Sequence, residues 1–523
     1  MTTTRDGASL VLCAVLAMTS PALAQGRHKS AKLVQVGQAA VPGPEPVEPA
    51  APEKPSMTLE EALGIAYETN PELAAAQAGL RATDEQVAQA NGGWRPTISI
   101  GATYGVEKYF FPVPVQPNGL IANGAITPVT HSISSAPVAN AAGTTNASIT
   151  DHPLNGQATI SQPIFRSGRT IAEIGRAKAL VRSGRAQLVA TEQTVLLSAV
   201  TAYMNVVRDG AIMKLREHNV AVLRRQRDST QLEFKAGSLT RTDVAQSEAR
   251  LATAQSDLVT ARGQLAISRA DFLQAIGRPA EALEAKPDLP KMPSEEDAML
   301  GMALRQNPAL VTAKENERAA EYAVDDAWGA MGPTLSVQGQ YQYSQSVLNS
   351  VTGFSSGGPP ESVPEHAVAI LGQLNVPIYQ AGVEEANVRQ ARELHAQTQL
   401  NISVADRQVR DAVEGAWSNF QSALGTIESN EATQKADEIA FEGVSKEQQV
   451  GGRTVLDVLN AEQELLNAQV ALVSSQRNAV VAAYQVLASG GALTAKSLGL
   501  KVKLYDPLEH YDNDANAFVG FGG

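Results

Sequence analysis

The side chains that most often carry chemistry are sparse in this 523-residue chain and form no recognisable catalytic pattern. The only cysteine, Cys13, lies in the first twenty residues, so the rest of the chain has no thiol for catalysis, disulfides or metal binding. The seven histidines are scattered without zinc-site spacing, and neither a phosphate-binding loop nor a dinucleotide-binding glycine motif occurs. The sequence therefore predicts no catalytic, cofactor-binding or metal-binding residues.

Acidic and basic side chains do gather in one short motif that occurs twice. Residues 236–244 read AGSLTRTDV and residues 450–458 read VGGRTVLDV, 214 positions later. In each copy a glycine is followed by threonine three residues on and by aspartate three residues after that. A glycine between two helical patterns is typical of a turn that needs a positive φ. For Asp457, an exposed surface carboxylate beside such a turn is the alternative to a functional role.

The duplication extends over most of the chain. Asn70-Pro71 recurs as Asn307-Pro308, 237 residues later. The segment 162–165 (QPIF) recurs as 376–379 (VPIY), 214 residues later. We therefore expect two structural repeats, over residues 57–293 and 294–489, followed by a C-terminal tail over 490–523. A duplicated unit usually packs against its copy with approximate symmetry.

Each repeat contains long helical patterns. One covers residues 58–92 with a break at Pro71, and the others cover 168–240, 242–276, 294–331, 382–450 and 454–489. After each glycine motif a large apolar residue recurs every seven positions, with a small residue three places on, which is typical of long, closely packed helices. Two of the patterns are about twice as long as the rest. We therefore expect half-length helices stacked end to end beside each of them, in long antiparallel hairpins.

Two inserts between the helices, 97–162 and 335–376, show the alternation of β-hairpins. One face is apolar and the other is polar without charge, which fits a transmembrane β-barrel; soluble hairpins with one solvated face are the alternative. The connections 111–156 and 344–365 are almost uncharged and rich in turn residues, which favours long exterior loops. Four strands cannot close a barrel, and an open edge is not tolerated in lipid, so several chains would have to share one.

Composition and the N-terminus indicate an exported protein. A net charge of −12 argues against nucleic acid as a partner, and 5% aromatic residues favour long helices over a large globular core. Arg5, the apolar run 10–18 and the sequence ALA at 22–24 predict a signal peptide over 1–24, removed near Ala24. Leu12 precedes Cys13 where a lipidation motif has a small residue, so we expect no lipid anchor. Regular prolines predict an extended linker over 25–56, and no later segment is apolar enough for a transmembrane helix.

Several of these motifs, taken in order, resemble the TolC-like outer-membrane efflux proteins, most closely the branch serving type I secretion. The resemblance rests on the Asn-Pro helices and on residues 162–165, 192–209, 236–244 and 451–460, and covers about residues 57–505. It implies a mainly α fold with a β transmembrane part. Each chain of a homotrimer would give four strands to a shared 12-stranded outer-membrane β-barrel and its long helical hairpins to a periplasmic α-barrel. The trimer would be a duct without cofactors that docks on a periplasmic adaptor protein and an inner-membrane transporter of the ABC or RND type.

By this resemblance the repeated glycine motifs form the periplasmic entrance of the duct. Asp457 matches an aspartate whose ring constricts the lumen, and a second acidic ring falls on Asn460, which is uncharged. Gly237, Gly451 and Gly452 fall on the helix turns at the tip where the adaptor docks. The loss of one acidic ring predicts a less cation-selective entrance.

The resemblance also implies a closing latch at the entrance. Arg453 matches an arginine that bonds to the residues matched by Thr242 and Asp243. A tyrosine of the same latch falls on Gln448, so the latch is only partly present.

Two other classes of protein remain as alternatives. A periplasmic adaptor is also built from helical hairpins, but membrane-type strands and a full-length repeat argue against it. An exported enzyme on a helical scaffold would need a nucleophile with its base, or a metal constellation, and none is visible. The sequence leaves open whether the cargo is a protein, a polysaccharide or a drug, and whether the partner pump is driven by ATP or by protons.

Overall fold

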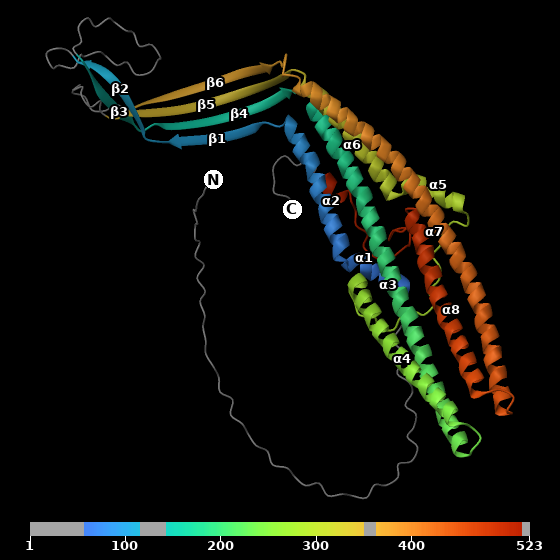
Figure 1. The fold of residues 1–523 in the computed structure, drawn as a ribbon. Helices are drawn as coiled ribbons and strands as arrows, with labels where there is room; N and C mark the ends of the chain where they lie inside the picture. Colours follow the sequence, from blue (N-terminus) through green and yellow to red (C-terminus); the bar gives the residue numbers. More distant parts are fainter. Residues whose placement is uncertain (1–56, 116–142, 350–361, 515–523) are drawn as a thin grey trace, which may run out of the picture. The chain divides into compact units, whose positions relative to one another are not determined.

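Long helices and a curved antiparallel sheet make up the part of the chain that the computed structural model describes, residues 57–115, 143–349 and 362–514 (Figure 1). All of these elements belong to one unit, Lys54–Gly523. The predicted signal peptide and linker, and the last residues of the predicted tail, lie outside the described residues. No described helix is both long enough and apolar enough to cross a membrane.

Two helices of 67 residues organise the structure, α3 (Arg169–Lys235) and α7 (Val383–Gln449). Shorter helices run beside them, and their bounds confirm the predicted break before Pro71 and the predicted half-length pattern. These are α1 (Leu59–Thr69), α2 (Pro71–Asn91), α4 (Arg241–Ile276), α5 (Glu296–Gln306), α6 (Pro308–Ala330) and α8 (Val455–Ser489), with a 3-10 turn η1 (Gly92–Trp94) and a terminal α9 (Glu509–Asp514).

The repeated Asn-Pro pairs join the half-length helices end to end, as the helix lengths predicted. The Asn70 side chain accepts a hydrogen bond from the first turn of α2 and donates one to the carbonyl of Ala275, near the end of α4. Asn307 does the same between α6 and α8, with Nδ2 2.8 Å from the carbonyl oxygen of Ser489. Proline in the first turn needs no amide partner, and the asparagine satisfies orphan groups of two helices at once.

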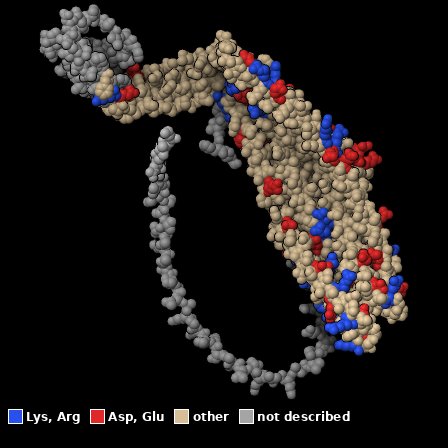
Figure 2. Space-filling view, viewed as in Figure 1, with Lys and Arg blue, Asp and Glu red and all other residues tan. Residues whose placement is uncertain are grey.

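The four predicted strands pair in the order β1-β4-β5-β6, with bounds β1 (Thr97–Tyr104), β4 (Leu154–Phe165), β5 (Thr334–Asn349) and β6 (Ser362–Asn375). The two hairpins share one register: Thr97 faces Ser161 in the first, and Thr334 faces Asn375 in the second. Apolar side chains on one face point to solvent in the single chain, Ile100 being 83% and Ile370 79% exposed. The strands β1, β4 and β5 contain no Asp, Glu, Lys or Arg, so the sheet is almost free of charge beside the charged helices (Figure 2).

The segments predicted as loops at the far end of the sheet are in part strand, and residues 116–142 and 350–361 of them lie outside the described residues. Two further strands, β2 (Glu107–Val115) and β3 (Gly143–Asp151), continue the first hairpin in the same register, so residues 111–115 and 143–151 are not loop. In the second hairpin, β5 runs to Asn349 and β6 begins at Ser362. The turn-rich composition was misleading because residues 107–115 contain Tyr, Phe and Val, and residues 143–151 contain Thr and Ile, all of which favour strands. The prolines at 112 and 114 lie on β2, which pairs with β3 alone among the described strands and therefore tolerates missing amides.

The main apolar core lies where the ends of the half-length helices meet on α3 and α7. Its largest buried side chains include Leu63, Leu196, Tyr203, Phe272 and Met299. The Tyr203 hydroxyl, inside this core, donates to the carbonyl of Met57 at 2.8 Å. The core therefore fixes the middle of the helical body, and the helix ends beyond it, on either side, are held by smaller contacts.

Candidate functional site at the helix turns

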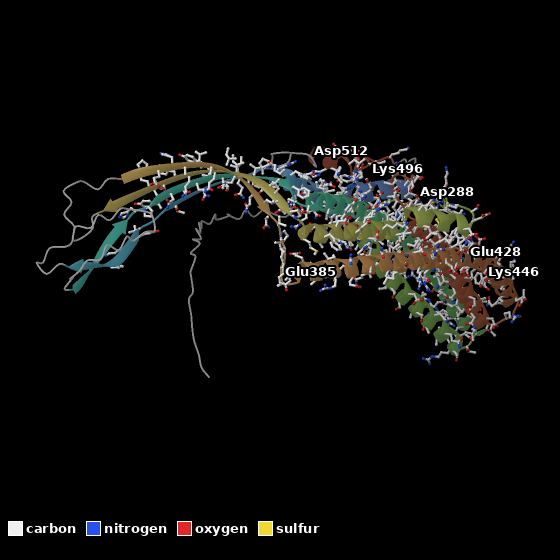
Figure 3. All side chains as sticks on the ribbon, turned by 90° about the horizontal axis from the view of Figure 1, so that it is seen from above. Asp288, Glu385, Glu428, Lys446, Lys496 and Asp512 are labelled. Carbon is white, nitrogen blue, oxygen red and sulfur yellow. The ribbon has the colours of Figure 1, made fainter. Side chains whose placement is uncertain are left out.

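The repeated glycine motifs form two turns at the end of the helical body remote from the sheet (Figure 1). We call residues 236–240 and 450–454 the paired turns. Figure 3 places Lys446 at this end of α7 and Glu385 at the end next to the sheet. Gly237 has φ +83° and Gly451 has φ +80°, which confirms the predicted positive-φ turns. In both turns the amide of the following residue donates to a carbonyl five residues back.

Gly452 has a separate reason to be glycine. Its amide donates to the carbonyl oxygen of Glu447 at 2.8 Å, and an added Cβ would lie 3.3 Å from the same oxygen. The turn is therefore tight, and a side chain at position 452 would contact the backbone at the end of α7 too closely.

The aspartates of the two motifs hold the first turn of the returning helices. The Oδ2 atom of Asp457 accepts hydrogen bonds from the amide and hydroxyl of Thr454, and Asp243 does the same with Thr240. Each threonine hydroxyl accepts the aspartate amide in return, which completes a capping box. The hydrogen bonds from Thr454 hold the pKa of Asp457 below its usual range, and those from Thr240 lower the pKa of Asp243. Both groups therefore carry a fixed negative charge at the paired turns.

The latch residues are not brought together within one chain. The Nε atom of Arg453 donates to Glu447 at 2.8 Å, and both side chains are about half exposed. Thr242 is exposed, and Asp243 is engaged in its own capping box. The carbonyl of Gln448 accepts the amide of Gly451. A latch between Arg453 and the motif of a neighbouring chain therefore stays a prediction.

A contact that the sequence analysis missed joins the two hairpins just behind the paired turns. The Nη2 atom of Arg250 on α4 donates to Oδ1 of Asn460 on α8 at 3.0 Å. Beneath it an apolar cluster combines residues of all three neighbouring helices: Val220 and Leu223 of α3, Leu251, Ala254 and Leu258 of α4, and Val455 and Leu459 of α8. Asn460, predicted to line the constriction, is thus also a fixed link between hairpins.

Glu462 is the second residue that sequence reasoning missed. It is 8% exposed and lines a small cavity between α3, α4 and α8. Burial raises the pKa of Glu462 to about 7, and Arg225 offsets this only in part. The counterpart in the first repeat, Glu248, is exposed, so periodicity alone gave no signal of this burial.

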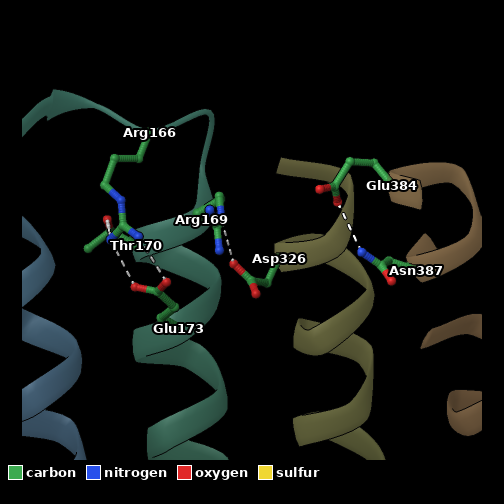
Figure 4. A network of polar contacts seen from close by, with 7 residues as sticks. All are labelled: Arg166, Arg169, Thr170, Glu173, Asp326, Glu384 and Asn387. Atoms are coloured by element: carbon green, nitrogen blue, oxygen red, sulfur yellow. Dashed lines mark hydrogen bonds and ion pairs between the residues drawn. The ribbon is translucent and has the colours of Figure 1, made fainter. Parts of the chain in front are cut away.

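At the opposite end of the helices, ion pairs brace the change from strand to helix (Figure 4). The guanidinium of Arg166 donates two hydrogen bonds to the carboxylate of Glu173, a bidentate ion pair. Arg169 forms an ion pair with Asp326 of α6 at 3.0 Å. Glycines with φ near +80° begin both long helices, at Gly168 and Gly382. These contacts hold the strands and the long helices in a fixed orientation at their junctions. Each charged side chain is paired with an opposite charge, as is typical of structural ion pairs. No cluster of His, Cys, Asp or Glu suited to a metal ion occurs among residues 57–115, 143–349 and 362–514.

Comparisons with known proteins agree with this geometry. The sequence model of a family described as "Outer membrane efflux protein" matches residues 128–278 and 299–492. The chain is 32% identical over 461 residues to outer membrane efflux protein BepC of Brucella suis, covering 87% of this chain and 90% of BepC. It is 24% identical to outer membrane protein TolC of Escherichia coli, over 59% of this chain and 63% of TolC.

A solved structure shows the same fold. The outer membrane channel CmeC of Campylobacter jejuni superposes with a TM-score of 0.67 at 15% identity, covering 88% of this chain and 89% of CmeC. At that identity the likeness concerns the fold alone.

Proposed function

Because the chain belongs to the outer membrane efflux protein family, we propose that three copies form an exit duct through the outer membrane and into the periplasm. The family consists of outer-membrane channels, not enzymes. The alternative of a periplasmic adaptor has no support from the family or from the fold.

The free edges of the sheet carry this proposal. Within the described residues β1 and β6 each pair with a single strand, so each presents an open edge. An open edge on an almost uncharged sheet with an exposed apolar face is not stable in lipid, whereas closure with other copies removes it. Three chains would supply the twelve strands of one barrel.

The unequal burial of α3 and α7 supports the same assembly. The two helices are equivalent elements of the two repeats, yet side chains that are buried on α3 have exposed counterparts on α7. Ala186 of α3 is 8% exposed, whereas Leu400, at the matching position of α7, is 68% exposed. In a ring of duplicated chains, the α2 and α4 helices of the next copy would cover this face of α7.

In this duct the paired turns would form the periplasmic entrance. Asp457 and Asn460 would face the constriction, and Arg453 would latch onto Thr242 and Asp243 of a neighbouring copy. The turn glycines would let the tips approach a periplasmic adaptor, which would connect the duct to an ABC or RND transporter of the inner membrane. Export would begin with removal of residues 1–24, and the cargo would be that of an efflux or type I secretion system.

Membrane fractionation tests the proposal. The protein should appear in the outer-membrane fraction and migrate as a trimer in unheated gel samples and as a monomer after boiling. Recovery of a soluble periplasmic protein, or of a folded monomer in detergent, would refute the duct.

A further inference from the structure

Glu462 is a buried carboxylate at the contact between the two helical hairpins. Its side chain lines a cavity formed by α3, α4 and α8, together with Asn219 and Thr253. The structure shows no hydrogen bond to the Glu462 carboxylate within residues 57–115, 143–349 and 362–514. A buried ionised carboxylate without such bonds is costly, whereas its protonated form is not.

The charged groups around Glu462 do not neutralise it fully. On α3 the charged group is Arg225, and on α4 the charged groups are Arg250 and Asp257; α7 contributes no residue to the cavity lining. Arg216 is paired with Asp257 at 3.0 Å, and Arg250 is bound to an amide on α8. Only Arg225 lowers the cost of the charge, and burial outweighs it.

We propose that Glu462 is a proton-controlled switch of the entrance: protonated, it lets α8 pack on α3 and α4, and ionised, it favours separation of the two hairpins. This regulation rests on the proposed function. The first turn of α8 carries Asp457 five residues away, so any shift of α8 against α4 moves the proposed constriction. The apolar cluster behind the paired turns opposes the separation and keeps it partial.

The sign of the pH response follows from the two pKa values. Packed, the carboxyl group holds its proton up to about pH 7, whereas in water its ordinary pKa is 4.5. Packing is therefore favoured most below pH 4.5, loses this advantage as pH rises to about 7, and changes no further above it. One pKa unit is a tenfold change, so the packed-to-separated ratio falls by at most about 300-fold per chain.

A distance between spin labels on the two paired turns measures this response. Exposed positions Ser238→Cys and Gln449→Cys carry the labels, in the Cys13→Ala background. Labelled chains are diluted with unlabelled ones so that the distance is within one chain. In detergent, the label distance should lengthen as pH rises from 4.5 to 7 and stay constant to pH 8.

Matched variants assign the response to one group. Glu462→Gln should keep the short distance at every pH, and Glu248→Gln, the exposed copy of the same position, should behave as wild type. Arg225→Gln should move the response to higher pH. A flat wild-type profile, or an unchanged response in Glu462→Gln, would overturn the switch. The label distance is measured within one chain, so it can be interpreted even if the trimer or its conductance is lost. Such a loss would count against the duct, not against the switch.

Discussion

At the scale of single residues, the two repeats contain the same helix-capping residues in different surroundings. Asp243 and Asp457 cap equivalent helices through equivalent threonines, and hydrogen bonding keeps both ionised. Each copy is followed by one partner of the bond between the hairpins, Arg250 after the first and Asn460 after the second. The copies therefore allow each substitution to be compared with the same substitution in the other copy.

Asp457→Asn should reduce the cation preference of the channel without dissolving the entrance. Removing the negative charge weakens attraction of cations at the constriction, while the amide oxygen can still accept from Thr454. Reversal potentials in planar bilayers with a salt gradient measure the preference. Asp243→Asn makes the same change in the other capping box and should leave selectivity closer to wild type. Equal loss of selectivity in both variants would show that Asp457 has no special position.

Arg453→Ala should raise single-channel conductance and sensitise cells to large antibiotics if the latch to a neighbouring chain exists. Within one chain this residue forms an ion pair with the half-exposed Glu447, and such exposed pairs contribute little to stability. The variant should therefore assemble normally. Arg241→Ala, an exposed arginine in the first motif, is the control. Unchanged conductance of an intact Arg453→Ala trimer would mean that no latch operates.

At the scale of elements, the junction between α8 and the start of α6 is closely packed around a glycine. Gly491, with φ +77°, follows α8, and an added Cβ would lie 2.9 Å from both the Cα of Asn307 and the carbonyl oxygen of Gln306. Gly499 has φ +67° but nothing within 4 Å of an added Cβ. The two glycines share the backbone conformation and differ in crowding.

Gly491→Ala should therefore destabilise the protein more than Gly499→Ala. The positive φ alone costs about 1–2 kcal/mol for alanine, and contact with backbone atoms that cannot rotate away adds roughly 1–3 kcal/mol at Gly491. The temperature at which the oligomer dissociates on gels, compared between the variants, checks this. Equal temperatures for both variants would contradict the crowding at the junction.

The sequence predicted helix ends well because the signals there are local. Helix caps such as Thr454 with Asp457, or the Asn-Pro pairs, involve residues no more than three positions apart. The structure that they favour therefore does not depend on the rest of the fold. The presence of both β-hairpins also followed from alternation. The extent of the far loops did not, because threonine-rich segments are compatible with loop and strand alike, and pairing with a partner decided the outcome.

The candidate site was predictable only in part, for a related reason. The turn glycines were recognised because a positive φ is a property of one residue. The burial of Glu462 and the bond from Arg250 to Asn460 depend on how two hairpins meet, which no spacing within one helix reveals. The acceptor that Arg453 finds within one chain, Glu447, was likewise missed, although it lies only six residues away.

At the scale of the whole molecule, the duplication specifies how copies should meet. In the chain, β4 pairs with β5 so that Ser161 faces Gln338. Positions on β6 correspond to β4 with an offset of 214, and positions on β1 correspond to β5 with an offset of 237. If the ring of copies continues this pattern, Asn375 of one chain faces Gly101 of the next. In a single chain these residues lie on strands at opposite edges of the four-stranded sheet.

Oxidative cross-linking of Gly101→Cys with Asn375→Cys, in the Cys13→Ala background, tests the shared barrel most directly. Directly opposed residues have Cβ atoms about 4.5–5.5 Å apart, within reach of a disulfide after small adjustment. Oxidation in outer-membrane preparations should give a covalent trimer on denaturing gels, reversible by reductant. Thr97→Cys with Asn375→Cys, displaced by four residues or roughly 13 Å along the strand, should give little. Monomers alone from the first pair, or equal cross-linking by both pairs, would contradict a barrel closed by three copies in this register.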